Sequence, residues 1–112
     1  MRRERIGSVL EREISSIVAQ EMKDPRLGFI TITEVRVSPD LKEAIVYFSS
    51  LENPSENLKI LNRAKGYIRS TLAHRVRIKV IPQLDFKIDE SYEKNRHLDE
   101  LFKEISKDHQ EE

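Results

Sequence analysis

Apolar residues near the N-terminus recur at the spacing of a helix. Between residues 3 and 22 they follow spacings of three and four, with polar residues between them: Ile6, Val9, Leu10, Ile14, Ile17, Val18 and Met22. This pattern predicts an amphipathic helix over 3–22. Asp24 and Pro25 end the helix, because proline disfavours helical geometry in the residue before it, and Gly28 lets the chain change direction.

Two segments rich in β-branched and aromatic residues follow, at 29–38 and 43–50. They predict two strands, and the turn residues Pro39 and Asp40 between them predict a hairpin. The hydrophobic alternation of the first strand changes face at 33–34. This change indicates either a bulge at that point or a strand that is buried on both faces.

Residues 53–75 predict a helical region with an interruption. Asn53 can cap its start, Pro54 suits the first helical position, and Glu56 can bond back to the cap as in a capping box. Helical spacing then continues through a set of apolar residues: Leu58, Leu61, Ala64, Ile68 and Leu72. Gly66 costs about 1 kcal/mol relative to alanine in a helix interior. The sequence therefore favours two helices that meet around this glycine, although one continuous helix also satisfies the pattern.

Strand-like alternation returns at 76–88, where six apolar residues share the even positions: Val76, Ile78, Val80, Leu84, Phe86 and Ile88. This alternation predicts a third strand with one buried face. Pro82 lacks an amide donor, which places it at a sheet edge or a bulge. A last short amphipathic helix is predicted from four further residues: Leu98, Leu101, Phe102 and Ile105.

The predicted order is α-β-β-α-α-β, an α+β domain in which helices cover one face of a three-stranded sheet. The chain has 112 residues, of which 38% are hydrophobic, so it can fill one modest core. We expect one domain over 1–90 and an acidic extension over 91–112. There is no cysteine for a disulfide or thiolate site, no long apolar run, and no secretory pattern at the start, which suits a cytoplasmic protein.

The formal net charge is zero, with 20 Lys and Arg against 20 Asp and Glu, but the charge is unevenly placed. Residues 55–88 carry eight bases and two acids, a net +6, whereas 89–112 carry four bases and nine acids, a net −5. No acid stands between Glu56 and Asp85, while seven bases do: Lys59, Arg63, Lys65, Arg69, Arg75, Arg77 and Lys79. Such a block is the expected footprint of a polyanion-binding surface. The acidic extension could shield this block, dock on it, or keep the protein in solution.

No arrangement of residues indicates catalysis. The three histidines lack metal-ligand spacing, and the three glycines are isolated, so neither a metal site nor a phosphate loop is expected. The acidic pairs at 89–90 and 99–100 stand in a polar segment, where a solvated face is expected. We therefore predict a protein that is not an enzyme and that uses no cofactor, metal or small-molecule substrate. A small hydrolase is the alternative that this pattern supports least.

A base-stacking sheet of the RRM kind is also disfavoured. Such a sheet carries aromatic residues on exposed strand positions, whereas the third predicted strand presents bases there. The aromatic residues are expected in the core instead: Phe29, Tyr47, Phe48 and Phe86.

Four segments, in order, resemble the ribosome-binding factor A family, whose fold is a type II KH domain. They are KDPRLGF at 23–29, VRVS at 35–38, RAKGYIR at 63–69, and PQLDF at 82–86 followed by DES at 89–91. The resemblance extends from about Arg5 to Ile105. It implies a factor of the bacterial cytoplasm that binds the free small ribosomal subunit as a monomer and assists late maturation of 16S rRNA, including processing of its 5′ end, before it leaves.

In that family an Ala-x-Gly kink replaces the Gly-x-x-Gly loop of other KH domains, and this chain has Ala64-Lys65-Gly66 at that place. The resemblance and the basic block together give a set of expected RNA-binding residues: Arg26, Arg63, Ala64, Lys65, Gly66, Arg69, Arg75, Arg77 and Lys79. Recognition of shape and phosphates on folded rRNA is expected, rather than clamping of unpaired nucleotides. The alternative is a protein-protein module that uses the amphipathic terminal helices.

Overall fold

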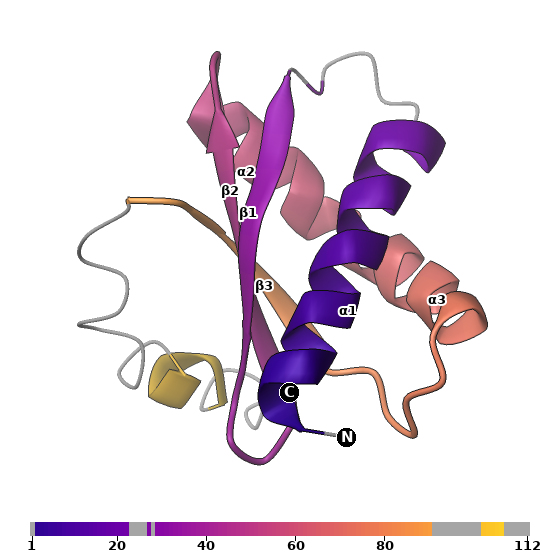
Figure 1. Ribbon diagram of the computed structural model, residues 1–112. Helices are drawn as coiled ribbons and strands as arrows, with labels where there is room; N and C mark the ends of the chain where they lie inside the picture. The colour runs from indigo at the N-terminus through magenta and orange to yellow at the C-terminus, as the bar shows by residue number, and fades with distance from the viewer. Residues whose placement is uncertain (1, 23–26, 28, 91–101, 107–112) are drawn as a thin grey trace.

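The computed structural model describes residues 2–22, 27, 29–90 and 102–106 (Figure 1). The predicted order of elements is confirmed. It runs α1 (Arg3–Ser16), the π-helical turn η1 (Ile17–Glu21), β1 (Ile30–Val37), β2 (Glu43–Ser50), α2 (Pro54–Arg63), α3 (Lys65–Arg75) and β3 (Gln83–Ile88). The first predicted helix thus has the expected extent, but its last turn is wider than an α-helix.

The three strands form one sheet in the order β1-β2-β3. β1 pairs with β2 in antiparallel fashion as the predicted hairpin, and β2 pairs with β3 in parallel. The register of the hairpin shifts between Ile32 and Glu34, so the bulge alternative is confirmed. Because of this extra residue, Ile32 and Val35 are buried in the same core although they differ in parity.

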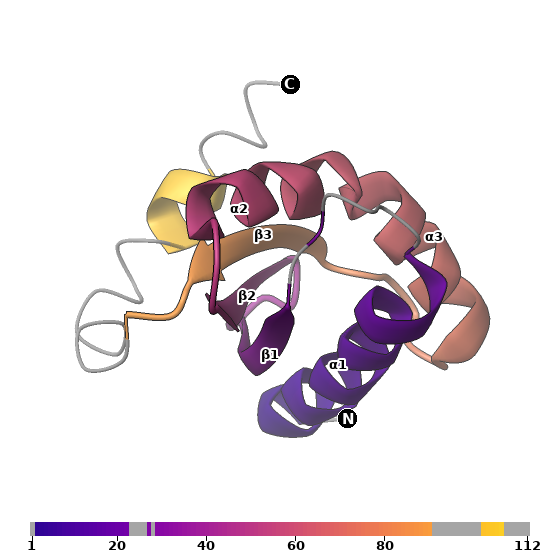
Figure 2. The same ribbon diagram turned by 90° about the horizontal axis from the view of Figure 1, so that it is seen from above.

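The helices cover one face of the sheet, as predicted, and α1 and α3 lie beside each other there (Figure 1). Apolar side chains from all three helices meet those of the sheet in the main core: Ile6, Leu10, Ile14, Leu61, Ile68, Leu72, Val35, Val46, Phe48, Leu84 and Phe86, among others. α2 and α3 form one bent rod (Figure 2). At Ala64 the backbone turns to φ −88° and ψ 2°, so two helices meet there rather than one continuing.

The predicted capping box at the start of α2 is wrong. Asn53 occupies the cap position in a left-handed conformation, φ 50° and ψ 53°, and its side chain makes no capping hydrogen bond. The fully buried Asn57 secures this turn instead, because its Nδ2 donates to Ser50 Oγ at 2.7 Å and to the Glu52 carbonyl at 3.0 Å. A buried amide of the helix thus holds the preceding turn in place, while the expected side-chain cap is not formed.

The predicted third strand over 76–88 is too long, since β3 begins only at Gln83. β3 pairs with β2 from Gln83 opposite Glu43, where β2 itself begins. Earlier residues would face the hairpin turn, which offers no strand to pair with, and Pro82 has no amide to donate. Residues 76–82 therefore form an irregular connection instead of strand.

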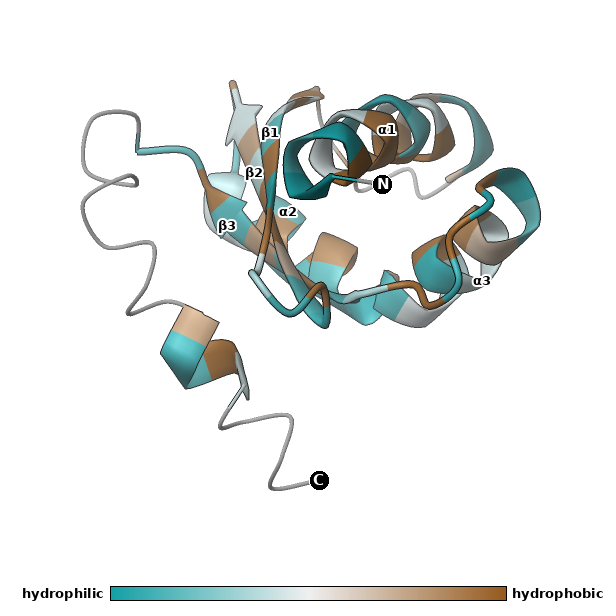
Figure 3. Cartoon of the chain, turned by 60° about the horizontal axis from the view of Figure 1, so that its bottom comes forward, coloured by the Kyte–Doolittle hydropathy of each residue, from teal (hydrophilic) through white to brown (hydrophobic). Residues whose placement is uncertain are grey.

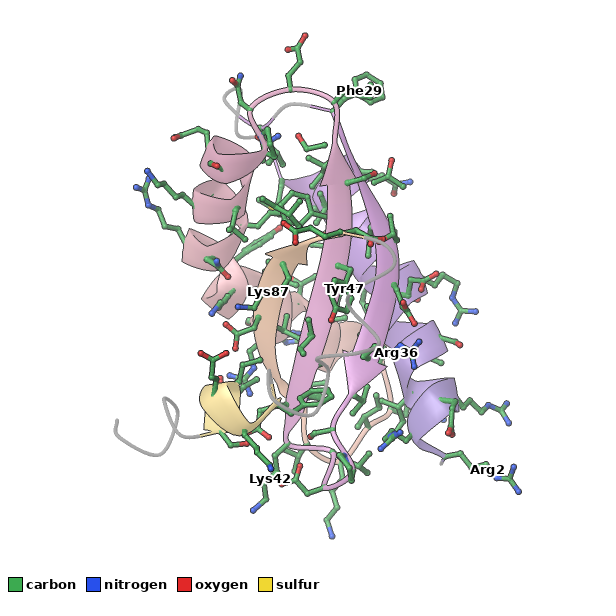
Figure 4. The ribbon with its side chains drawn as sticks, turned by 90° about the vertical axis from the view of Figure 1, so that its left-hand side faces the viewer. Arg2, Phe29, Arg36, Lys42, Tyr47 and Lys87 are labelled. Carbon is green, nitrogen blue, oxygen red and sulfur yellow. The ribbon has the colours of Figure 1, made fainter. Side chains whose placement is uncertain are left out.

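The aromatic prediction holds for three residues and fails for one. Tyr47, Phe48 and Phe86 are buried, but Phe29 is 82% exposed. Phe29 precedes the first paired residue of β1 and lies at the far end of the sheet, where its ring points away from the protein (Figure 4).

The opposite face of the sheet is covered from the C-terminus. Residues 102–106 form a helical turn, coloured yellow in Figure 1, on the side of the sheet away from α1 and α3. Phe102 and Ile105 pack there against Ile45 and Tyr47 in a second, smaller core. β2 is therefore buried on both faces. The predicted helix residues Leu98 and Leu101 lie outside the described part of the chain.

Candidate nucleic-acid interface

The backbone at the junction of α2 and α3 is open to the outside. Gly66 lies in the first turn of α3 and is exposed. A side-chain carbon built on Gly66 would have no neighbouring atom of the described residues within 4 Å. The fold itself therefore does not require glycine at this position. A ligand such as a phosphate can approach the backbone closely there.

Two bases stand on α2 just before this junction. Lys59 and Arg63 are four residues apart, so they share one face of the helix, and both are exposed. Neither forms an ion pair within the part of the chain that the structure describes. Their charges are thus available to an outside anion beside Gly66.

Lys65 stands between Ala64 and Gly66 but is already paired. Its Nζ lies 3.1 Å from Asp85 Oδ1, an ion pair that joins the start of α3 to β3. Part of its charge is therefore neutralised within the protein, and an RNA phosphate would share this ammonium group with Asp85.

Arg69 ties α3 to the irregular connection that precedes β3. Its Nε donates to the Pro82 carbonyl at 3.0 Å, and its Nη2 donates to the Ile81 carbonyl at 2.9 Å. These bonds satisfy carbonyls that a strand would otherwise have paired. Arg69 therefore has a structural function, whatever else it contacts.

Arg75 joins the far end of α3 to the first helix. One of its nitrogens lies 3.4 Å from Glu13 Oε2 and donates to Ser16 Oγ at 3.2 Å, while the other is paired with Glu21. Two carboxylates thus surround this guanidinium. Its contribution to a positive surface is smaller than the charge count suggests.

Arg77 and Lys79 lie beyond the other end of α3, in the 76–82 connection, and both are exposed. α3 has 11 residues, which corresponds to about 16 Å of helix. These two bases therefore follow the end of α3, whereas Gly66 lies at its start. Arg26 lies outside the residues that the structure describes.

The sequence analysis missed one basic residue that groups with Arg77 and Lys79. Lys42, in the hairpin turn, lines the same pocket of about 440 Å³ as Arg77 and Lys79. No sequence signal connects them, because the turn meets the connection only through the pairing of β2 with β3. The basic block did contain Lys59, although that residue was not among the expected RNA contacts.

Among the residues that the structure describes, no group of three or more His, Cys, Asp or Glu side chains is placed to hold a metal ion. None of the helices described is long and apolar enough to cross a membrane.

Comparison with known proteins agrees with the resemblance in the sequence. The family model for ribosome-binding factor A matches residues 2–102. The ribosome-binding factor A of Thermodesulfovibrio yellowstonii is 46% identical over 108 residues, which cover 95% of this chain and 92% of that protein. That of Macrococcus caseolyticus is 40% identical over 111 residues, which cover 96% and 97%.

Solved structures of ribosome-binding factor A also superpose on this chain. The crystal structure of ribosome-binding factor A from Thermus thermophilus superposes with a TM-score of 0.73 at 30% identity, over 79% of this chain and 97% of that one. A homology model of the Thermus thermophilus factor, fitted into a cryo-EM map of a 30S complex, superposes with a TM-score of 0.69 at 29% identity, over 80% and 97%. By sequence and by fold, this chain belongs to the ribosome-binding factor A family.

Proposed function

We propose that this chain binds the free small ribosomal subunit as a monomer and assists late maturation of 16S rRNA, including processing of its 5′ end, without catalysis. Family membership supports the ribosome as the target, since the Thermus thermophilus factor was fitted into a map of a 30S complex. The observation that carries the RNA contact is the open backbone at Gly66 beside two exposed bases, Lys59 and Arg63.

In this proposal the RNA backbone approaches the junction of α2 and α3. The missing side chain at Gly66 lets a phosphate come close, and the amides that open α3 add partial positive charge. Lys59 and Arg63 hold neighbouring phosphates, which positions the protein on folded rRNA. The factor then favours one rRNA conformation because it binds immature and mature subunits with different affinity.

The rival proposal is a protein-protein module that uses the apolar faces of the terminal helices, but both faces are buried within the protein. The apolar stripe of α1 is buried against the sheet, and Phe102 and Ile105 are buried on the opposite face. We therefore assign the RNA contacts to residues 1–90. Within the extension over 91–112, we assign 102–106 a packing role.

The decisive experiment is sedimentation of the tagged chain in an extract of the cells that make it. We expect the protein to migrate with free small subunits and to be absent from translating ribosomes. A double variant, Lys59→Glu with Arg63→Glu, should lose this co-migration. The matched control reverses two exposed bases of α1, Arg5→Glu with Arg12→Glu, and should retain it.

Salt dependence gives a second measurement of the same contact. Each neutralised phosphate contributes about −0.9 to the slope of log affinity against log salt on a B-form duplex, and about −0.7 on a single strand. The junction variant, which removes two phosphate contacts, should therefore bind purified small subunits with a slope flatter by about 1.4 to 1.8. An unchanged slope and affinity in a folded double variant would reject the junction as the RNA surface.

A further inference from the structure

A second candidate site lies at the end of the molecule where α1 begins. A pocket of about 440 Å³ opens between the N-terminal turn of α1, the hairpin turn and the 76–82 connection. All three segments lie at the lower end of the molecule in Figure 1, and Figure 3 turns this end toward the viewer. Its lining is Ile6, Asp40, Leu41, Lys42, Arg77, Ile78, Lys79, Val80 and Pro82.

The interior of this pocket is aliphatic. Ile6 and Pro82 are buried, whereas Leu41 and Val80 are 37% and 66% exposed. Leu41 also has a φ of 65°, a conformation that costs free energy for a residue with a large side chain. The hairpin turn would form more readily with glycine or asparagine there. The fold nevertheless keeps a leucine at this exposed position.

Positive charge surrounds this apolar surface. Lys42, Arg77 and Lys79 are exposed and form no ion pair with any residue that the structure describes. Arg2, at the start of α1, lies at the same end of the molecule as Lys42 (Figure 4). These cations give the pocket a basic rim.

The one carboxylate of the rim is engaged within the hairpin turn. Asp40 Oδ1 accepts hydrogen bonds from the Ser38 hydroxyl at 2.7 Å and from the Lys42 amide at 3.0 Å. These bonds, the hydroxyl first, hold the pKa of Asp40 below its usual value. Asp40 therefore stabilises the turn that presents Leu41 and Lys42, and it leaves the rim with a net positive charge.

We propose that this pocket binds an acidic peptide segment of a protein partner. One bulky apolar side chain of the partner occupies the space between Leu41, Val80 and Pro82, and flanking carboxylates meet Lys42 and Arg77. Apolar anchors that fill pockets supply most of the binding free energy in such contacts, while charges at the rim set specificity and association rate.

Two other occupants fit the same lining less well. An unstacked RNA base stacks on an aromatic ring or on an arginine guanidinium, and the pocket offers no aromatic ring and only Arg77 for stacking. The chain's own residues 107–112 are acidic but include no apolar side chain that could serve as the anchor. Gly66 does not line this pocket, so the pocket and the junction of α2 and α3 are different candidate sites.

The test is an NMR titration of the isotope-labelled full chain with a synthetic heptapeptide, a phenylalanine flanked on each side by three glutamates. A second peptide carries alanine in place of the phenylalanine, and hexauridylate serves as the RNA probe. We expect the phenylalanine peptide to shift the amide signals of 40–42 and 77–81. The alanine peptide should bind about tenfold more weakly or worse.

Two variants test whether the peptide binds at this pocket. Val80→Asp should abolish the peptide-induced shifts, whereas Leu51→Asp, at an apolar residue that is 87% exposed outside the pocket, should retain them. The other signals of each spectrum report whether the variant is folded. Val80→Asp should still migrate with free small subunits, which separates this proposal from the ribosomal one.

Three results would overturn the proposal. The first is the absence of shifts at the pocket with millimolar phenylalanine peptide. The second is equal binding of the two peptides, which would leave charge alone as the cause. The third is a response of the pocket amides to hexauridylate but not to the peptide, which would assign this surface to RNA.

Discussion

Two glycines, each within a helix, differ in what surrounds them. A side-chain carbon on Gly7 in α1 would lie 2.8 Å from the Val35 carbonyl oxygen, a contact too short to persist. The same carbon on Gly66 in α3 would meet nothing within 4 Å among the described residues. The space beside Gly7 is occupied by β1, so α1 can pack this closely on the sheet only with glycine at this position. At Gly66 no described residue fills the space, so an outside group can enter it.

The same contrast divides the basic residues. Arg69 and Arg75 point inward, to the carbonyls before β3 and to the carboxylates of the first helix. Lys59 and Arg63 point outward, without ion pairs in the described structure. A block of positive charge in a sequence thus contains two kinds of residue: some stabilise the fold through contacts within the protein, and others can bind a ligand.

A large loss of stability is expected from filling the space at Gly7. Gly7→Leu forces a side chain against the Val35 carbonyl, and overpacking of this kind costs about 1–3 kcal/mol or more in free energy of unfolding. Because α1 must then move off the sheet, we expect the upper end of this range. Gly66→Leu should not lower stability, and it should raise it by up to about 1 kcal/mol, because glycine is the poorer helix former. Urea unfolding of both variants measures the difference, and equal losses would remove the contrast.

A second expectation concerns the C-terminal turn. Phe102 is 8% exposed against Ile45 and Tyr47, so Phe102→Ala should lower the free energy of unfolding by about 2–4 kcal/mol. Phe29→Ala is the matched control, because that ring is already exposed, and it should cost less than about 0.5 kcal/mol. For the same reason, truncation after Glu90 should destabilise the domain. A truncated protein as stable as the full chain would show that the second core contributes nothing.

A smaller loss is expected from Arg69→Met. The substitution keeps the aliphatic stem but leaves the Ile81 and Pro82 carbonyls without their donor, which costs about 1–2 kcal/mol for partly buried groups. Lys59→Met removes a base without an ion pair in the described structure and should leave stability within about 0.5 kcal/mol. Thermal melting of the two variants checks this pair. If both melt like the unaltered chain, Arg69 belongs with the outward bases.

Much of the fold follows from patterns that are local in the chain. Helical spacing over 3–22 and the phase change at 33–34 each involve neighbouring residues, so the sequence alone predicts the first helix and gives the bulge as one of two alternatives. The start of β3 depends instead on where β2 begins, since a strand cannot extend past its partner. The alternation over 76–88 does not show where β2 begins, so it cannot predict the first residue of β3.

The candidate site was predictable only in part, for a related reason. The Ala-Lys-Gly segment and the charge block mark the junction, but a count of charges treats every base as free. The partners of Arg69 and Arg75 lie on other elements and appear only when the chain is folded. The basic pocket that includes Lys42 and Arg77 is likewise assembled from separate segments.

The most selective change is Gly66→Leu measured on RNA affinity rather than on stability. Because no described neighbour occupies the space, the new side chain leaves the fold intact but extends into the path of an approaching phosphate. We expect binding to purified small subunits to weaken about tenfold, or about 1.4 kcal/mol, with no fall in melting temperature. Gly66→Ala, with a smaller group, should weaken binding less, so the graded pair reports steric exclusion. Unaltered affinity in both variants would mean that RNA does not approach the backbone here, and the open space at Gly66 would then be incidental.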